Sequence, residues 1–165
     1  AIGITVTGLG TDGNAYLLED VTVKAGPATW GRVAASAFER HEADLIVAEQ
    51  NYGGEMVRYV LKTAKPNAHI KLVNASRGKV LRAEPISSLH EQGKVRFVGH
   101  FPELEDELCG FTTTGYIGDR SPNRADAFVF GVTELFPGLT RKEKREKKKG
   151  RNYESTAGNT GWMAG

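Results

Sequence analysis

Hydrophobic and polar residues follow two periodicities along this chain. Residues 2–9 and 15–23 show the apolar pattern of strands, and Asp12 followed by Gly13 is a hairpin turn signal. Residues 29–43 then carry apolar side chains at helical spacing, with Thr29 as the expected cap. The pattern therefore predicts a β-hairpin followed by a helix.

The rest of the chain alternates between strands and helices. We expect strands at residues 44–49, 69–75 and 94–99 and helices at residues 55–65, 101–111 and 124–136. Residues 76–93 form a loop that leads into a helix with Pro85 in its first turns, and residues 112–123 form a polar loop. Strands and helices that alternate after a hairpin predict an α/β domain with a mixed sheet.

Polar residues follow the third predicted strand at an unusual place. Residues 45–48 are a continuous apolar run, which is typical of a strand covered on both faces, yet Glu49 and Gln50 come next. In open α/β sheets, ligands bind outside the carboxyl ends of parallel strands. Glu49 is therefore a candidate catalytic residue, and a cap on the following helix is the alternative interpretation.

A second carboxylate, Asp126, lies in the first turn of the last predicted helix. The inner face of that helix consists of Ala125, Phe128, Val129, Val132 and Leu135. An acid in a first turn is also favourable with the helix dipole, which is the structural alternative. If this helix packs near the end of the Glu49 strand, the two carboxylates face each other across a cleft. Their hard oxygen atoms suit Mg²⁺ or Mn²⁺, and two such ions can support phosphodiester cleavage.

The charge of the chain is concentrated in one segment. The 165 residues sum to a net charge of only +2, whereas residues 140–151 hold eight basic and two acidic residues. We expect residues 1–138 to form one folded domain and residues 139–165 a basic, flexible tail. The tail is either solvated, bound to DNA through phosphates, or docked on an acidic partner.

Several other kinds of site are excluded by the sequence. The single cysteine, Cys109, cannot form an internal disulfide and is expected in the core. The four histidines are dispersed, which argues against zinc. The chain has no glycine motif that would cradle nucleotide phosphates and no apolar run that would span a membrane.

Four stretches of the sequence carry a family resemblance. They are ADLIVAEQNYGGEMV, SRGKVLRAEPISSLHEQGKVRFVG, FPELEDEL and GDRSPNRADAFVFGVTEL. In this order and spacing, residues 2–137 resemble the nuclease domain of the terminase large subunit of tailed bacteriophages. The resemblance implies a ribonuclease H-like fold, a mixed sheet flanked by helices. It also implies metal-dependent endonucleolytic cutting of concatemeric viral DNA during genome packaging, in the cytoplasm of the bacterial host.

The resemblance also implies roles for individual residues. Glu49 and Asp126 would be catalytic ligands of a two-metal Mg²⁺ or Mn²⁺ site. The residues expected to contact the DNA backbone are Arg77, Lys79, Arg82, Arg124, Lys147, Lys148 and Lys149. The alternative for residues 77–82 is a solvated helix start. The implied partners are double-stranded DNA, the terminase ATPase domain, the small terminase subunit and the portal.

The sequence departs from the family pattern in two ways. The family carries a first catalytic aspartate at the end of a strand before the hairpin, and Ala1 already matches the following strand. We therefore expect a domain truncated at its N-terminus that lacks its first strand and that ligand. The second departure is Asn123, three residues before Asp126, where relatives often carry an acid or a His; its amide oxygen makes it a secondary candidate ligand. Asp20 is another secondary candidate, although it does not occupy the missing position.

This departure leaves the function open among three alternatives. The first is the metal-dependent endonuclease, inactive or slow in the form given. The second is a catalytically impaired DNA-binding or assembly module of the packaging machine. The third is another enzyme of the same fold, such as a junction resolvase.

Overall fold

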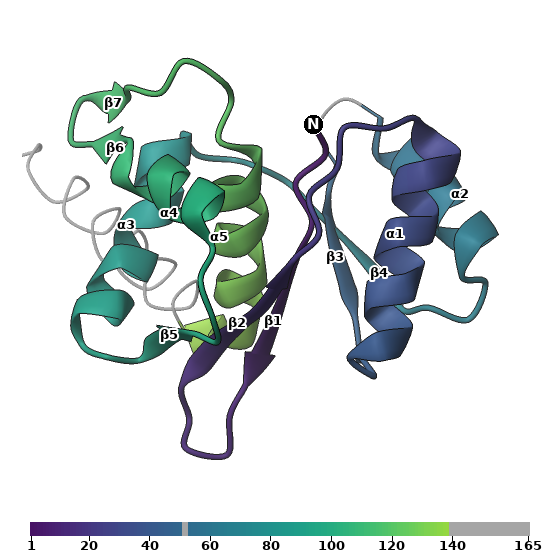
Figure 1. The fold of residues 1–165 in the computed structure, drawn as a ribbon, viewed down its shortest axis with the longest axis horizontal. Helices are drawn as coiled ribbons and strands as arrows, with labels where there is room; N and C mark the ends of the chain where they lie inside the picture. The colour runs from purple at the N-terminus through teal and green to yellow at the C-terminus, as the bar shows by residue number, and fades with distance from the viewer. Residues whose placement is uncertain (51–52, 139–165) are drawn as a thin grey trace, which may run out of the picture. The chain divides into compact units, whose positions relative to one another are not determined.

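The computed structural model describes residues 1–50 and 53–138 (Figure 1). Its first compact unit spans residues 1–135, and a second unit begins at Phe136. The strands are β1 (Thr5–Leu9), β2 (Ala15–Asp20), β3 (Ile46–Glu49), β4 (Ile70–Val73), β5 (Val95–Phe97), β6 (Phe111–Thr112) and β7 (Gly115–Tyr116). The helices are α1 (Pro27–Arg40), α2 (Gly54–Ala64), α3 (Lys79–Glu91), α4 (Pro102–Cys109) and α5 (Asn123–Leu135). The expected tail, including Lys147, Lys148 and Lys149, lies outside the described residues.

The strands pair in both orientations, which confirms the α/β class with a mixed sheet. β1 and β2 form the expected antiparallel hairpin, and β5 adds to β2 in parallel. β3 and β4 pair in parallel, with Glu49 opposite Val73. Helix α5 packs against β1 and β2 of the three-stranded sheet and against β3 of the β3–β4 pair. One helix therefore contacts strands of both sheets.

The apolar strand β3 is less covered than its sequence predicts. Ile46, Val47 and Ala48 are only half-buried. Among the described strands β3 pairs with β4 alone, so its other edge has no strand neighbour. Helices α2 and α5 both contact β3, and its open edge accounts for the remaining exposure of these residues.

Two groups of buried side chains hold the first unit together. Trp30 of α1 and Leu61 of α2 pack with Ala68 and Ile70 near β4. The second group surrounds helix α5. The α5 residues Phe128, Val129 and Val132 are buried, as are Leu17 of β2, Val95 of β5 and Leu104 of α4. The rings of Phe97 and Phe128 meet edge to face at 5.5 Å. The predicted inner face of α5 is thus confirmed.

Helix α1 begins before the residue that the sequence suggested, whereas Pro85 lies in the first turns of α3 as expected. Helix α1 starts at Pro27 with Gly26 as its N-cap, so Thr29 lies inside the first turn and is not the cap. Proline suits the first helical position because its missing N–H would have no partner there. Helix α3 starts at Lys79, which places Pro85 in the second turn.

Two expectations for the end of helix α4 and the segment after it are not met: Cys109 was expected in the core, and residues 112–123 were expected to form a polar loop. Cys109, the last residue of α4, is exposed, so the expectation that it lies in the core is wrong. Residues 111–116 form the β6–β7 hairpin, in which the rings of Phe111 and Tyr116 lie 5.2 Å apart. Strands of two residues are too short to show an alternating pattern, which is why the hairpin escaped detection.

None of the helices in the described part of the chain has both the length and the apolar character needed to cross a membrane.

Candidate functional site

Asp126 lies where helix α5 begins, and two basic side chains hold it. The backbone N–H of Asp126 donates to the carbonyl oxygen of Pro122 at 2.9 Å, as in a first helical turn. The Lys79 ammonium donates to Oδ2 of Asp126, and Nη2 of Arg82 lies 3.4 Å from Oδ1. The Asp126 side chain is only 15% exposed, so this ion pairing takes place largely away from water.

Both basic partners come from the first turn of helix α3. Lys79 also donates to the hydroxyl of Ser121, 3.1 Å away in the loop before α5. The guanidinium of Arg82 lies over the ring of Phe130, 4.7 Å from its centre, which is a cation–π contact. Nε and Nη1 of Arg82 are buried and have no hydrogen-bond partner among the described residues. These contacts join the N-terminal ends of α3 and α5 into one charged site.

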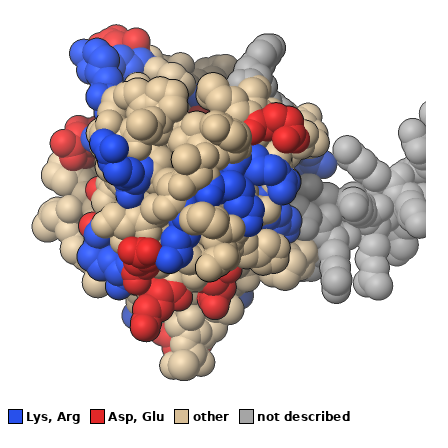
Figure 2. All heavy atoms as spheres, turned by 90° about the vertical axis from the view of Figure 1, so that its right-hand side faces the viewer, with Lys and Arg blue, Asp and Glu red and all other residues tan. Residues whose placement is uncertain are grey.

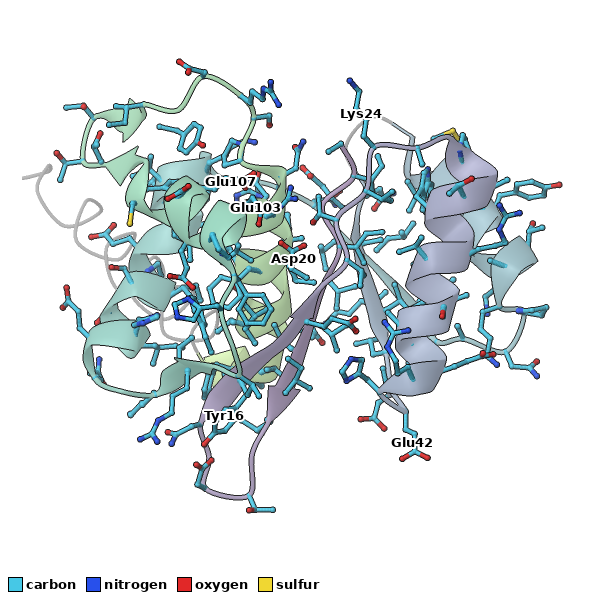
Figure 3. All side chains as sticks on the ribbon, in the orientation of Figure 1. Tyr16, Asp20, Lys24, Glu42, Glu103 and Glu107 are labelled. Carbon is cyan, nitrogen blue, oxygen red and sulfur yellow. The ribbon has the colours of Figure 1, made fainter. Side chains whose placement is uncertain are left out.

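Asp20 lies at the end of β2, between that strand and α5 (Figure 3). Oδ2 of Asp20 is 3.0 Å from Nε of Arg124, an ion-pair distance without the alignment of a hydrogen bond. Oδ1 accepts the backbone N–H of Thr22 at 2.9 Å. Asp20 thus ties β2 to α5, and the metal-binding role of Asp20 and the DNA-binding role of Arg124 stay predictions.

Asn123 is the first residue of α5 and contacts the beginning of the chain. Its side-chain amide nitrogen donates to the carbonyl oxygen of Ala1 at 2.9 Å. A Cβ on Gly3 would lie 1.8 Å from the backbone oxygen of Asn123, so only glycine allows this close approach. The amide oxygen is the side-chain atom of Asn123 that could coordinate a cation.

Glu49 is exposed at the carboxyl end of β3, as predicted. Its strand neighbour Val73 ends β4, and residues 74–78, which include Arg77, connect β4 to Lys79. A connection of that length spans at most about 20 Å. In Figure 1 the ends of β3 and β4 and the beginnings of α3 and α5 lie on the same side of the first unit. That Glu49 and Asp126 share one cleft stays a prediction.

The donor atoms at Asp126 fit a hard divalent cation. The carboxylate already attracts two positive groups, and the Lys79 ammonium stands where a metal ion could bind. Mg²⁺ usually keeps several waters and is held by one or two carboxylates together with phosphate groups of the substrate, so a large set of protein ligands is not needed. Within residues 1–50 and 53–138, no group of three or more His, Cys, Asp or Glu side chains could hold a metal.

Basic side chains that the sequence analysis did not single out lie on the face formed by α1 and α2, with acidic side chains among them (Figure 2). Lys62 donates to the carbonyl oxygens of Pro66 and Ala68, at 3.1 and 2.8 Å. Lys65 pairs with Glu39 of α1 at 2.6 Å. These lysines hold the end of α2 and the α1–α2 contact, so we assign them no ligand.

A groove of about 580 Å³ runs beside β4, away from the charged site. It is lined by Leu45, Gln50, Glu55, Arg58, His69, Ile70, Lys71, Leu72 and Glu134. Lys71 and Glu134 form an ion pair at 2.7 Å within it. None of the residues at Asp126 lines this groove, so it is not the candidate site.

The sequence nominated Lys79, Arg82 and Asp126 but not the pairing between them. Ser121, Phe130 and Thr22 were missed altogether, although each contacts a candidate residue. Lys79 and Asp126 lie 47 positions apart, and no local pattern reports a contact over that separation. The proline of the Ser-Pro motif before α5 was a visible signal for the start of the helix, but not for the contact of Ser121 with Lys79.

The mixed sheet and its flanking helices form an α/β domain that is consistent with the ribonuclease H-like class. The sequence model of the terminase RNaseH-like domain family matches residues 2–134. The chain therefore belongs to this family, which confirms the expected terminase nuclease module and its fold. A search of curated proteins found no match.

Proposed function

We propose that this domain is the metal-dependent endonuclease of a phage DNA-packaging terminase and cuts concatemeric double-stranded DNA. The observation that carries the proposal is the charged site at Asp126, where a largely buried carboxylate draws Lys79 and Arg82 from another helix. Membership of the terminase family supports the substrate and the setting, the cytoplasm of an infected bacterium.

The residues proposed to hold Mg²⁺ or Mn²⁺ are Asp126 and Glu49, with Asn123 and Asp20 as secondary ligands. A bound pair of such ions would supply an activated water and charge stabilisation of the leaving 3′ oxygen.

The chain's own residues supply the arrangement of the site. Arg82, fixed on Phe130, holds the Asp126 carboxylate in one orientation. Arg77, Lys79 and Arg124 would bind phosphate oxygens of the DNA backbone, which orients the duplex without reading its sequence. In the packaging machine the proposed partners are the ATPase domain, the small terminase subunit and the portal.

Plasmid nicking in the presence of Mn²⁺ tests this proposal. Glu49→Ala and Asp126→Ala should each reduce cleavage at least a hundredfold, because each removes a proposed ligand. Asp106→Ala, which changes an exposed carboxylate on α4, is the matched control. Cleavage that survives both changes would exclude this site.

A DNA-binding or assembly module without catalysis is the second candidate. It is favoured by the pairing of Asp20 and Asp126 with basic side chains, which already neutralises both carboxylates. This alternative predicts salt-sensitive binding of DNA and no cleavage at any concentration of Mg²⁺ or Mn²⁺. A preference for branched DNA over linear duplex in a binding competition would instead indicate a junction resolvase.

A further inference from the structure

The two basic residues at Asp126 differ in how firmly they are held. Arg82 is only 14% exposed, and its guanidinium lies over Phe130. Lys79 is 39% exposed, and its ammonium contacts only Asp126 and Ser121 among the contacts observed. Arg82 is therefore a fixed partner of the carboxylate, whereas water and ions can reach the Lys79 side chain.

The position of Lys79 in its helix makes it a poor permanent partner. Lys79 is the first residue of α3, and Gly78 before it provides no side-chain cap. The free N–H groups at a helix start carry partial positive charge, which disfavours a cation there. Lys79 is thus retained by Asp126 and Ser121 and not by its own helix.

We propose that Lys79 is the exchangeable counter-cation of Asp126. A divalent cation and the ammonium compete for the same carboxylate oxygen, Oδ2, so binding of the metal releases Lys79. The released side chain stays beside Arg77 at the start of α3, where it can bind a phosphate oxygen of the nucleic acid. Lys79 is then a positioning residue that sets the affinity of the metal site. This inference rests on the proposed function.

Competition of this kind has a clear electrostatic consequence. A positive charge at hydrogen-bond distance from the ligand atom opposes the binding of a second cation, and the effect is larger at a partly buried site than in water. Removing the charge should therefore raise the affinity for metal. We expect a gain of about tenfold, which corresponds to about 1.4 kcal/mol.

The test measures Mn²⁺ binding to the full 165-residue chain by calorimetric titration, with no DNA present. Lys79→Met should bind Mn²⁺ about tenfold more tightly than the unmodified chain, and Lys79→Gln, which keeps a polar group for Ser121, should do the same. Lys79→Arg keeps the charge and should show little gain. Lys24→Met, at an exposed lysine that points away from the domain in Figure 3, is the matched control.

The dependence of thermal unfolding on Mn²⁺ gives a second readout that a purely structural role would not produce. In EDTA, Lys79→Met should unfold at a lower temperature than the unmodified chain, because Asp126 loses an ionic partner. Added Mn²⁺ should raise the unfolding temperature of Lys79→Met more than that of the unmodified chain, because tighter binding stabilises the folded state more.

The outcomes separate this inference from the proposed function. If Asp126→Asn abolishes Mn²⁺ binding but Lys79→Met and Lys79→Gln leave the affinity unchanged or lower it, the metal site stands and the exchange is wrong. If Asp126→Asn leaves Mn²⁺ binding unchanged, the metal site itself is wrong and the exchange falls with it.

Discussion

Single carboxylates in this domain are held by basic residues from other secondary-structure elements. Asp126 of α5 is paired with α3, Asp20 of β2 with α5, and Glu19 of β2 with α1. Each pair joins two secondary-structure elements, so it contributes to their packing as well as to the local charge. The three pairs differ in exposure, and the Glu19 pair is the most open to water.

Glu19 makes the stability of the domain depend on acid pH. Its carboxylate accepts hydrogen bonds from Nη2 of Arg40 and interacts with Nε2 of His41, each at 2.7 Å. The bond from Arg40 is the main reason that the pKa of Glu19 lies below its ordinary value of 4.5. A lowered pKa in the folded state stabilises the fold above pH 4.5, and this contribution disappears as the pH falls through the lower, folded-state pKa.

We therefore expect Glu19→Gln to lower the free energy of unfolding at pH 7, and we expect this loss to shrink as the pH falls below 4.5. The difference at pH 7 should be at most about 1 kcal/mol, because Arg40 is half-exposed and water screens the pair. Urea unfolding at a series of pH values measures it. Glu42→Gln, an exposed neighbour at the end of α1, is the control, and an equal pH profile for the two variants would contradict the assignment.

At the scale of elements, the beginning of α5 depends on a carboxylate from α4. Oε2 of Glu107 accepts the backbone N–H of Ala125 at 3.0 Å, which satisfies one of the free donors of the first turn. Glu107 points toward α5, and Glu103 lies on the same helix (Figure 3). The cap is thus supplied by tertiary structure and not by the residue before the helix.

Removing this cap should destabilise the domain. We expect Glu107→Ala to lower the free energy of unfolding by about 0.5–2 kcal/mol, the range found for helix caps. Glu107→Gln keeps an acceptor oxygen and should lose less. Glu103→Ala, at an exposed position of the same helix, should change stability little. Chemical denaturation compares the three variants, and equal losses for Glu103→Ala and Glu107→Ala would contradict the capping role.

The contact between β1 and α5 depends on a glycine inside the helix. A Cβ on Gly131 would lie 2.7 Å from Oγ1 of Thr7, closer than such atoms approach. Thr7 is β-branched and sits in the β1–β2 hairpin, so it cannot move away easily. The steric cost of alanine at this position exceeds the gain of about 1 kcal/mol in helix propensity.

Gly131→Ala should therefore destabilise the domain by about 1–3 kcal/mol, as for overpacked cores. In a Thr7→Ala background the same change should be neutral or stabilising, because the obstructing hydroxyl and methyl groups are gone. A double-mutant cycle from urea unfolding measures this coupling. A loss in the Thr7→Ala background equal to that in the unmodified chain would show that the Thr7 contact is not the cause.

Local patterns in the sequence carry some features of this structure and not others. The inner face of α5 was predicted correctly because four of its buried residues recur at helical spacing. The β6–β7 hairpin was missed because its strands hold two residues each. At the site, Glu49 and Asp126 stood out by their positions at element ends, whereas the pairing of Lys79 with Asp126 joins residues 47 positions apart. Such long-range pairs follow from the packing of α3 on α5, which no short pattern encodes.

At the scale of the whole molecule, positive charge is unevenly distributed along the chain. Residues 140–151 carry a net charge of +6, so the remainder of the chain sums to −4. If the domain itself binds DNA as proposed, the attraction would have to come from local groups such as Arg77 and Lys79. The basic segment lies outside the described residues, and its role is open to a separate measurement.

The salt dependence of DNA binding distinguishes these two sources of charge. Each phosphate contact contributes about 0.9 to the slope of log affinity against log salt concentration, because one condensed counterion is released. Arg77→Gln should reduce the slope by about 0.9, and simultaneous change of Lys147, Lys148 and Lys149 to Gln by about 2.7 if all three bind phosphates. Lys24→Gln should leave the slope unchanged. Counterion release counts every phosphate contact, wherever it lies on the protein. If the slope falls only when Lys147, Lys148 and Lys149 are changed, DNA binds to the basic tail and not beside Asp126.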